Sequence, residues 1–296
     1  MTDALRGKVV LITGPARGIG AATARELASR GATLSLVGME PELLQALAHE
    51  LGGAHVWHAC DVTDQAAVDD AVRETVDALG GIDVVVANAG IATNGTLLST
   101  DIESLIRVID VNLGGVFRIV KASLPSVIER RGYLLLVSSA AAFSAMPGLS
   151  AYGAAKAGVE QLANVLRLEL AVHGVDVGSA HMSWVDTDLV RDIQADVAAF
   201  TRTISRLPGP FGTITPVGDC AAAFVRAIEA RSRKVFVPTS LGRMSALRQV
   251  LGSAMVQRGL RATLAPIIQE SEREATETAR AFGVHSVGMG KNAPAP

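Results

Sequence analysis

Short apolar runs alternate with longer segments of helical spacing along most of the chain. The short runs are rich in Val, Ile and Leu and fall at residues 9–12, 34–37, 55–60, 82–87, 133–137, 175–180 and 235–237. Several are apolar almost throughout, which is typical of strands that helices cover on both faces of a sheet. Between them, apolar residues recur at helical spacing, as at 66–79, 105–128 and 154–172.

Strands separated by helices predict right-handed βαβ crossovers. The expected fold is α/β and doubly wound (Rossmann), with a parallel seven-stranded sheet. The alternation continues without a linker to about Pro238, which indicates a single domain over 1–238. Helical patterns at 244–257 and about 262–282 predict a helical C-terminal extension over 239–282. The remaining residues, 283–296, are rich in Gly, Pro and small side chains and are expected to be disordered.

Composition narrows the function classes. Hydrophobic residues make up 49% of the 296-residue chain, which favours a folded globular protein, and the net charge of −2 gives no electrostatic basis for binding nucleic acid. Cys60 and Cys220 lie far apart and lack metal-ligand spacing, so we expect two reduced core thiols, no metal and a cytoplasmic protein. We expect no secretory signal, and no apolar stretch uninterrupted enough to span a bilayer.

A glycine-rich loop follows the first strand directly. Residues 13–20 read TGPARGIG, and a helical pattern begins at their end. Such a turn lets the backbone approach a pyrophosphate, while the helix N-terminus supplies N–H groups and a positive dipole end. An ordinary tight turn is the alternative, but the strand–turn–helix context favours a dinucleotide. The expected binding residues are Gly14, Arg17, Gly18, Ile19 and Gly20.

The end of the second strand bears on the choice of cofactor. Folds that select NAD usually place an acid there, to bind the ribose hydroxyls. This chain has Gly38 and Met39 instead, and Glu40 comes two residues late. Arg17 could pair with a 2′-phosphate, although it could also be a solvated loop charge. We therefore expect NADP(H) to be favoured over NAD(H).

Three polar residues predict acid–base chemistry. Ser139 ends a strand, and Tyr152 and Lys156 lie four residues apart at the start of a helical pattern. They share a helix face, so the ammonium can lie near the phenol and favour phenolate. The serine hydroxyl can hydrogen-bond a substrate oxygen as negative charge develops on it.

Together these motifs resemble the short-chain dehydrogenase/reductase superfamily, over roughly 7–238. The loop matches its TGxxxGxG motif. The resemblance implies that Asp61 and Val62 contact the adenine. It also implies that the NAG motif ends the fourth strand and steadies the sheet beside the cofactor; its residues are Asn88, Ala89 and Gly90.

The same resemblance assigns roles to the catalytic residues. Asn112 would interrupt a helix and anchor a proton-relay water, completing a tetrad with Ser139, Tyr152 and Lys156. Tyr152 would act as general acid in reduction and as base in oxidation. Lys156 would hold the nicotinamide ribose and lower the tyrosine pKa, while Ser139 orients the substrate oxygen. The neighbouring Ser138 is assigned to structure.

The chain departs from the family after the sixth strand. Met182 and Ser183 stand where the family usually has Pro-Gly, which adds two side chains beside the nicotinamide pocket. The backbone of Val185 should still meet the nicotinamide carboxamide, and the family's threonine is present as Thr187. Apolar residues after it predict either a lid over the substrate or packing on the core: Leu189, Val190, Ile193, Val197, Phe200, Ile204, Leu207 and Phe211.

We therefore expect an NAD(P)-dependent oxidoreductase acting on a carbonyl or secondary alcohol, and the apolar lid suits a medium or large apolar substrate. The alternative is a cofactor-binding regulator or scaffold without turnover, against which the intact tetrad argues. The family's usual homotetramer implies a homo-oligomer, as a tetramer or a dimer.

The C-terminal extension has two readings. Its apolar stripe comprises Met244, Leu247, Val250, Leu251, Ala254 and Met255, with Arg243, Arg248, Arg258 and Arg261 around it. The stripe could contact an anionic membrane surface peripherally, or pack on its own subunit, over the substrate site or in an oligomer interface. Packing is favoured, because the segment lacks the Trp or Phe that usually anchors an interfacial helix.

Overall fold

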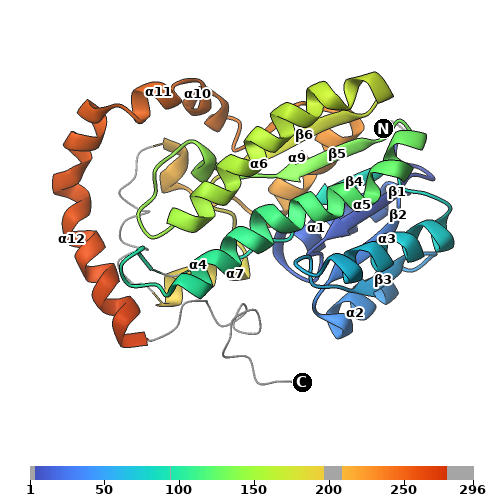
Figure 1. Ribbon diagram of the computed structural model, residues 1–296, viewed down its shortest axis with the longest axis horizontal. Helices are drawn as coiled ribbons and strands as arrows, with labels where there is room; N and C mark the ends of the chain where they lie inside the picture. Colours follow the sequence, from blue (N-terminus) through green and yellow to red (C-terminus); the bar gives the residue numbers. More distant parts are fainter. Residues whose placement is uncertain (1–3, 94, 197–208, 279–296) are drawn as a thin grey trace.

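Seven parallel strands form one sheet at the centre of the molecule (Figure 1). The structure is a computed structural model that describes residues 4–93, 95–196 and 209–278. The strands are β1 (Val9–Thr13), β2 (Thr33–Gly38), β3 (Val56–Ala59), β4 (Val84–Ala87), β5 (Tyr133–Val137), β6 (Asp176–Met182) and β7 (Lys234–Val237). Every apolar run identified in the sequence contains or overlaps one of them, so the α/β doubly wound fold is confirmed.

The order of the strands creates the crevice in which the site lies. The sheet runs β3-β2-β1-β4-β5-β6-β7, and β1 pairs in parallel with both β2 and β4. The chain therefore winds outward in one direction from β1 and in the other from β4. The connections leave the sheet in opposite directions at this point, which opens a crevice at the carboxyl ends of the strands.

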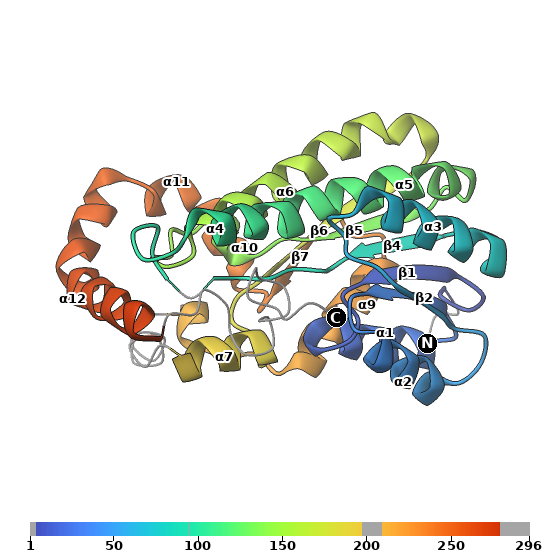
Figure 2. The same cartoon turned by 60° about the horizontal axis from the view of Figure 1, so that its bottom comes forward.

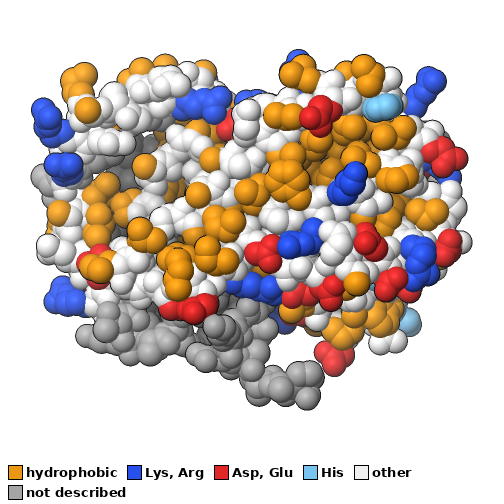
Figure 3. Space-filling model, viewed as in Figure 1, with side chains coloured by type: hydrophobic (Ala, Val, Ile, Leu, Met, Phe, Trp, Pro, Cys, Tyr) orange, Lys and Arg blue, Asp and Glu red, His pale blue; other side chains and the backbone are white. Residues whose placement is uncertain are grey.

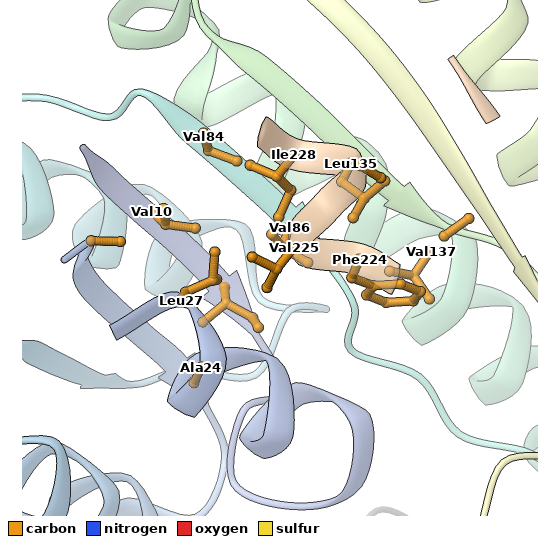
Figure 4. Packing of buried hydrophobic residues seen from close by; sticks show 14 of the residues in the cluster. Val10, Ala24, Leu27, Val84, Val86, Leu135, Val137, Phe224, Val225 and Ile228 are labelled. Carbon is orange, nitrogen blue, oxygen red and sulfur yellow. The ribbon is translucent and has the colours of Figure 1, made fainter. Parts of the chain in front are cut away.

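Helices cover both faces of the sheet (Figure 2). One face is covered by α1 (Gly18–Ser29), α2 (Pro41–Leu51) and α9 (Val217–Glu229). The other is covered by α3 (Gln65–Leu79), α5 (Gly115–Glu129) and α6 (Ser150–Glu169). Figure 4 shows Phe224, Val225 and Ile228 of α9 packed among sheet side chains such as Val86 and Leu135. Burial on both faces explains why the strands are apolar at successive positions.

A long helical stretch leads from the crevice along one face of the sheet. It consists of α4 (Ile102–Ile109), a π-helical turn (Asp110–Gly114) and α5. Among the described residues, Ile102–Glu129 is long and apolar enough to cross a membrane by length and composition, although we expected no such stretch. Val116, Ile119 and Val120 pack in the core on one face of the sheet, so burial explains part of the apolar character, whereas Ile102, Ile106 and Phe117 are exposed.

The C-terminal extension differs from its expected form. Instead of one helix over 244–257, the chain forms α10 (Leu241–Ala246), α11 (Arg248–Leu251) and α12 (Ala254–Thr278). The expected single stripe is therefore divided: Met244 packs inward, whereas Leu247, Val250 and Met255 are exposed. Figure 3 shows basic and apolar side chains side by side over this end of the molecule.

Buried side chains and hydrogen bonds join the extension to the core, including one from Thr96 Oγ1 to Glu272 Oε1 on α12 at 2.9 Å. Leu241 is fully buried with Phe143 and Phe211, and Arg248 Nη1 lies 3.2 Å from Glu160 Oε2 on α6. The domain boundary at Pro238 stays a prediction. The C-terminal residues 283–296, expected to be disordered, lie outside the described residues.

Candidate active site

A cleft of about 260 Å³ lies at the carboxyl ends of the strands. Every residue that the sequence nominated for the site lines it, except Gly20. The lining residues among them are Gly14, Arg17, Gly18, Ile19, Gly38, Met39, Asp61, Val62, Asn88, Ala89, Gly90, Asn112, Ser139, Tyr152, Lys156, Val185 and Thr187. The fold thus brings residues from distant parts of the chain into one site.

The glycine loop forms a cradle at one end of the cleft. Gly14 and Gly18 have φ angles of 65° and 52°, in the left-handed region that favours glycine. Gly20 lies beneath the loop, where a Cβ would stand 2.2 Å from the Gly14 carbonyl oxygen. Because α1 begins at Gly18, its first N–H groups lie beside this tight backbone turn. The cradle fits the pyrophosphate of a dinucleotide.

Thr13 and Asn88 fasten the ends of β1 and β4 beneath this cradle. The Asn88 side-chain amide donates to the carbonyls of Thr13 at 3.0 Å and Gly14 at 3.2 Å. In return, the Thr13 hydroxyl accepts from the backbone N–H groups of Asn88 and Ala89, each at 3.0 Å. The loop geometry is therefore set by both sides of the crevice.

Asp61, at the adenine end, has a partner that sequence reasoning missed. Arg107 of α4 donates from Nη2 to Asp61 Oδ2 at 2.6 Å, and Thr63 donates to Oδ1 from both its N–H and its hydroxyl. Burial raises the pKa of Asp61, but the hydrogen bonds from Arg107 and Thr63 outweigh this effect and the pKa is lowered. Asp61 is thus a fixed carboxylate, and no local motif indicated that a helix 46 residues away would hold it.

Arg17 and Glu40 form an ion pair beside the end of β2. Arg17 Nε lies 2.9 Å from Glu40 Oε1, and both side chains are partly exposed. Glu40 also lines the cleft, which the sequence analysis had not expected because the residue comes late after the strand. A 2′-phosphate bound here would have to compete with this carboxylate for the guanidinium.

The π-helical turn between α4 and α5 positions Asn112. Its Nδ2 donates to the carbonyls of Ile91 at 2.7 Å and Val108 at 2.9 Å. Its buried Oδ1 has no hydrogen-bond partner among the described residues. A Cβ at Gly90 would stand 2.6 Å from this oxygen and 3.4 Å from Lys156 Nζ, so the glycine keeps the space between them open. An unpartnered acceptor beside a buried ammonium is a position that fits a bound water or ligand hydroxyl.

Ser139, Tyr152 and Lys156 meet at the middle of the cleft. Ser139 follows β5, and its Oγ accepts from the Ala141 N–H at 3.2 Å. Lys156 Nζ lies 5.5 Å from the centre of the Tyr152 ring and donates to the Val137 carbonyl at 2.9 Å. Ser138 points away, since its hydroxyl donates to the Lys156 carbonyl at 2.8 Å.

The electrostatics of this group differ from the expectation that Lys156 lowers the tyrosine pKa. Burial raises the pKa of Tyr152, and a hydrogen bond with Ser139 lowers it only in part. Burial also lowers the pKa of Lys156 to about 8. Desolvation therefore dominates both groups in the free protein, which spacing on a helix could not reveal.

The segment that departs from the family pattern is held firmly. The Ser183 N–H donates to the Val237 carbonyl at 2.9 Å, and Val185 forms a parallel bridge with Thr215. Trp184 donates from Nε1 to the Phe211 carbonyl at 3.0 Å. Met182, Ser183 and Trp184 all line the cleft, so the lost Pro-Gly pair is replaced by side chains that shape the pocket.

Thr187 packs against the glycine loop at Gly18. Its hydroxyl donates to the Val185 carbonyl at 3.3 Å, and a Cβ at Gly18 would stand 3.2 Å from its methyl group.

The expected lid is seen only in part. Leu189 and Val190 line the cleft as expected. Phe211 instead packs with Phe143 and Leu241 in a separate small cluster, so it does not line the cleft. The side chain of Ile193 is not described, and Val197, Phe200, Ile204 and Leu207 lie outside the described residues. Met146 and Leu149, from a loop without a recognisable motif, were missed and line the apolar end.

Comparisons with known proteins agree with this geometry. The family model for short chain dehydrogenase matches residues 8–198. The (-)-isopiperitenol/(-)-carveol dehydrogenase of Mentha piperita is 36% identical over 236 residues, which cover 76% of this chain and 89% of the relative. An uncharacterized oxidoreductase of Mycobacterium bovis is 31% identical over 268 residues, covering 87% of this chain and 74% of the relative. A crystal structure of a short-chain type dehydrogenase/reductase from Mycobacterium marinum superposes with a TM-score of 0.71 at 28% identity, covering 78% of this chain and 94% of that one. The chain therefore belongs to the short-chain dehydrogenase/reductase superfamily.

Proposed function

We propose that this protein transfers hydride between NADP(H) and an apolar secondary alcohol or its ketone. Family membership supports an NAD(P)-dependent oxidoreductase in general terms. The observation that carries the proposal is the meeting of Tyr152, Ser139 and Lys156 with the unpartnered Asn112 Oδ1, in a cleft whose other end is the glycine cradle.

The residues divide the chemistry among them. NADP(H) or NAD(H), held by the glycine cradle and the Asp61 end, supplies or accepts the hydride. Tyr152 donates a proton to the substrate oxygen in reduction and removes it in oxidation. Ser139 donates a hydrogen bond to that oxygen as negative charge develops. Lys156 would hold the ribose hydroxyls of the bound cofactor, and Asn112 Oδ1 would anchor a water that exchanges the Tyr152 proton with solvent, supplying it in reduction and taking it up in oxidation.

The preference for NADP(H) rests on charge at the end of β2. Gly38 and Met39 present no carboxylate there, and Arg17 lines the same cleft, where it could pair with a 2′-phosphate. The Glu40 carboxylate is already paired with Arg17, so it would limit the gain from a 2′-phosphate. We therefore infer a moderate preference for NADP(H).

The substrate is inferred to be a medium-sized or large apolar molecule. The cleft that holds Tyr152 is also lined by apolar side chains: Trp184, Leu189, Val190, Met146 and Leu149. A relative named for isopiperitenol and carveol supports cyclic terpenoid alcohols as the first compounds to try.

We also propose a homo-oligomer, as a tetramer or a dimer. Packing is the main role of the C-terminal extension in this proposal, supported by the buried Leu241 and the Arg248–Glu160 pair. Exposed Leu247, Val250 and Met255 leave peripheral membrane contact as a secondary role. Residence in the cytoplasm stays a prediction.

The test is turnover followed by nicotinamide absorbance. Purified protein is assayed with NADPH and NADH against a panel of ketones, and with NADP and NAD against the matching alcohols, carveol included. Turnover in the wild type that is lost in Tyr152→Phe supports the proposal. Tight cofactor binding without turnover on any compound would instead favour a regulator.

A further inference from the structure

His181 is a buried histidine that the proposed reaction does not use. It lies on β6 one residue before the segment that lines the pocket, and its side chain is fully buried. The ring stands 5.3 Å from Phe236, nearly parallel, and 5.9 Å from Phe143, which is tilted by 48°. This aromatic packing holds the imidazole in one orientation.

Both ring nitrogens have partners, and the partners fix which nitrogen carries the proton. Nδ1 lies 3.4 Å from the carbonyl oxygen of Ser139, which can only accept. Nε2 lies 3.1 Å from Ser179 Oγ, and that oxygen already accepts from Arg167 Nη2 at 3.0 Å. A neutral imidazole carries one proton, which Nδ1 donates to the Ser139 carbonyl, so Nε2 accepts from the Ser179 hydroxyl. The chain of hydrogen bonds runs in one direction, from Arg167 to the catalytic serine.

The charged groups around the ring leave it neutral. Burial, with smaller contributions from Lys234 and Arg167, lowers the pKa of His181 to about 4, against Glu160 and the Ser139 carbonyl, which raise it. Glu160 is itself held by Lys234 at 3.0 Å and Arg248 at 3.2 Å. At neutral pH the imidazole is thus a neutral donor of fixed tautomer.

Ser139 depends on the β6 segment for both its backbone and its side chain. Its carbonyl accepts from the Ala142 N–H at 3.1 Å as well as from His181. Its Oγ donates to the carbonyl of Met182, the residue after His181, at 3.5 Å. The last ladder bond between these strands joins the Ser138 N–H to Ala180 at 2.8 Å, so Ser139 is the first residue beyond it.

We propose that His181 is a positioning residue, which holds the Ser139 backbone through Nδ1 and so aims the Ser139 hydroxyl at the substrate oxygen. The inference rests on the proposed reaction at Tyr152. It assigns to a buried core side chain an effect on the chemical step, because the serine contact strengthens as charge develops on the substrate oxygen.

Three variants test it, each assayed for turnover, cofactor affinity and thermal unfolding. His181→Phe keeps an aromatic ring between Phe143 and Phe236 and removes both nitrogens. His181→Asn keeps a donor where Nδ1 lies, whereas His181→Gln places its amide where Nε2 lies. We expect His181→Phe to lower kcat by about 10- to 100-fold, the scale of a misplaced catalytic group. KM and cofactor affinity should stay near wild type.

The pH profile supplies a readout that a loss of packing would not move. A hydrogen bond with Ser139 lowers the Tyr152 pKa, and the titratable Lys156 Nζ lies 5.5 Å from the centre of the Tyr152 ring. In His181→Phe, the apparent pKa governing alcohol oxidation should therefore shift upward. In His181→Asn it should stay nearer that of the wild type.

The outcomes separate this inference from the proposed function. A wild type without turnover on the panel defeats the proposed function. With an active wild type, kcat unchanged in His181→Phe overturns the inference, as does equal activity in His181→Asn and His181→Gln. If His181→Phe does not fold, the comparison of Asn with Gln decides: higher kcat in Asn supports the inference.

Discussion

The buried ammonium of Lys156 should lower the stability of the cofactor-free protein. Its side chain is 2% exposed, and burial lowers its pKa from an ordinary value near 10.5 to about 8. That difference corresponds to about 3 kcal/mol of folding free energy lost wherever the group is protonated in both states. The hydrogen bond from Lys156 to the Val137 carbonyl stabilises the folded protein by about 1 kcal/mol and offsets part of this loss. We therefore expect Lys156→Met to stabilise the free protein by about 2 kcal/mol near pH 7, while turnover is lost.

The pH dependence gives the sign of this effect. Above about pH 8 the folded protein releases the Lys156 proton, whereas the unfolded chain keeps it until about pH 10.5. The unfolded state then binds more protons, so the stability of the wild type rises with pH through this window. The advantage of Lys156→Met should accordingly be full below about pH 8 and shrink toward about pH 10.

Urea unfolding of both chains without cofactor measures the difference directly. Subtracting the unfolding free energies of the two chains at each pH cancels the contributions of the titratable groups that both chains contain. Lys121→Met, which replaces an exposed lysine of α5, is the matched control and should show neither the gain nor its pH dependence. A Lys156→Met variant that is less stable than wild type near pH 7, or whose advantage is constant up to about pH 10, would refute the reasoning.

Four further outcomes are expected. Tyr152→Phe should keep the fold and cofactor binding and lose turnover by about 10²–10⁴-fold, measured by nicotinamide absorbance; near-normal turnover would rule out its role. Glu40→Gln should raise the ratio of kcat/KM with NADPH to kcat/KM with NADH, because it frees Arg17 to bind a 2′-phosphate, and Arg17→Ala should lower this ratio. A ratio that falls in Glu40→Gln and rises in Arg17→Ala would defeat the cofactor assignment. Gly20→Ala should abolish cofactor binding, measured by fluorescence titration, because the added Cβ would collide with the Gly14 carbonyl oxygen. An unchanged cofactor affinity would contradict that geometry. A chain that ends after Thr239 should either no longer form the oligomer or bind substrate more weakly, and it should sediment with anionic vesicles no differently from the full chain. If the full chain binds the vesicles and the shortened chain does not, the extension has the membrane role instead.

The parts of the site that the sequence predicted are those set by local rules. The strand runs, the glycine loop and the four-residue spacing of Tyr152 and Lys156 depend on neighbours along the chain, and the fold brought them together as expected. Asn112 was also placed correctly, at a π-helical turn that interrupts a helix.

The parts that the sequence did not reveal depend on distant partners. Arg107 reaches Asp61 across 46 residues, and Glu40 turns toward Arg17 across 23. The pKa of Tyr152 is raised because the side chain is buried, and the spacing of residues along a helix does not reveal that burial. The prediction of a continuous helix over 244–257 is wrong: the chain breaks there into α10, α11 and the start of α12, and Met244 packs in a core cluster while other residues of the stripe are exposed.

The position of α9 has a consequence for synthesis on the ribosome. Its Phe224, Val225 and Ile228 are the cover for sheet residues that are translated more than a hundred residues earlier, such as Val84 and Val86 (Figure 4). Until α9 emerges, one apolar face of β1 and β4 has only α1 and α2 to shield it. At about 5–20 residues per second the interval between Val86 and Phe224 lasts about 7 to 28 seconds, in which the nascent chain is open to chaperones and to aggregation. The yield of folded protein should therefore depend on translation speed and on chaperone supply.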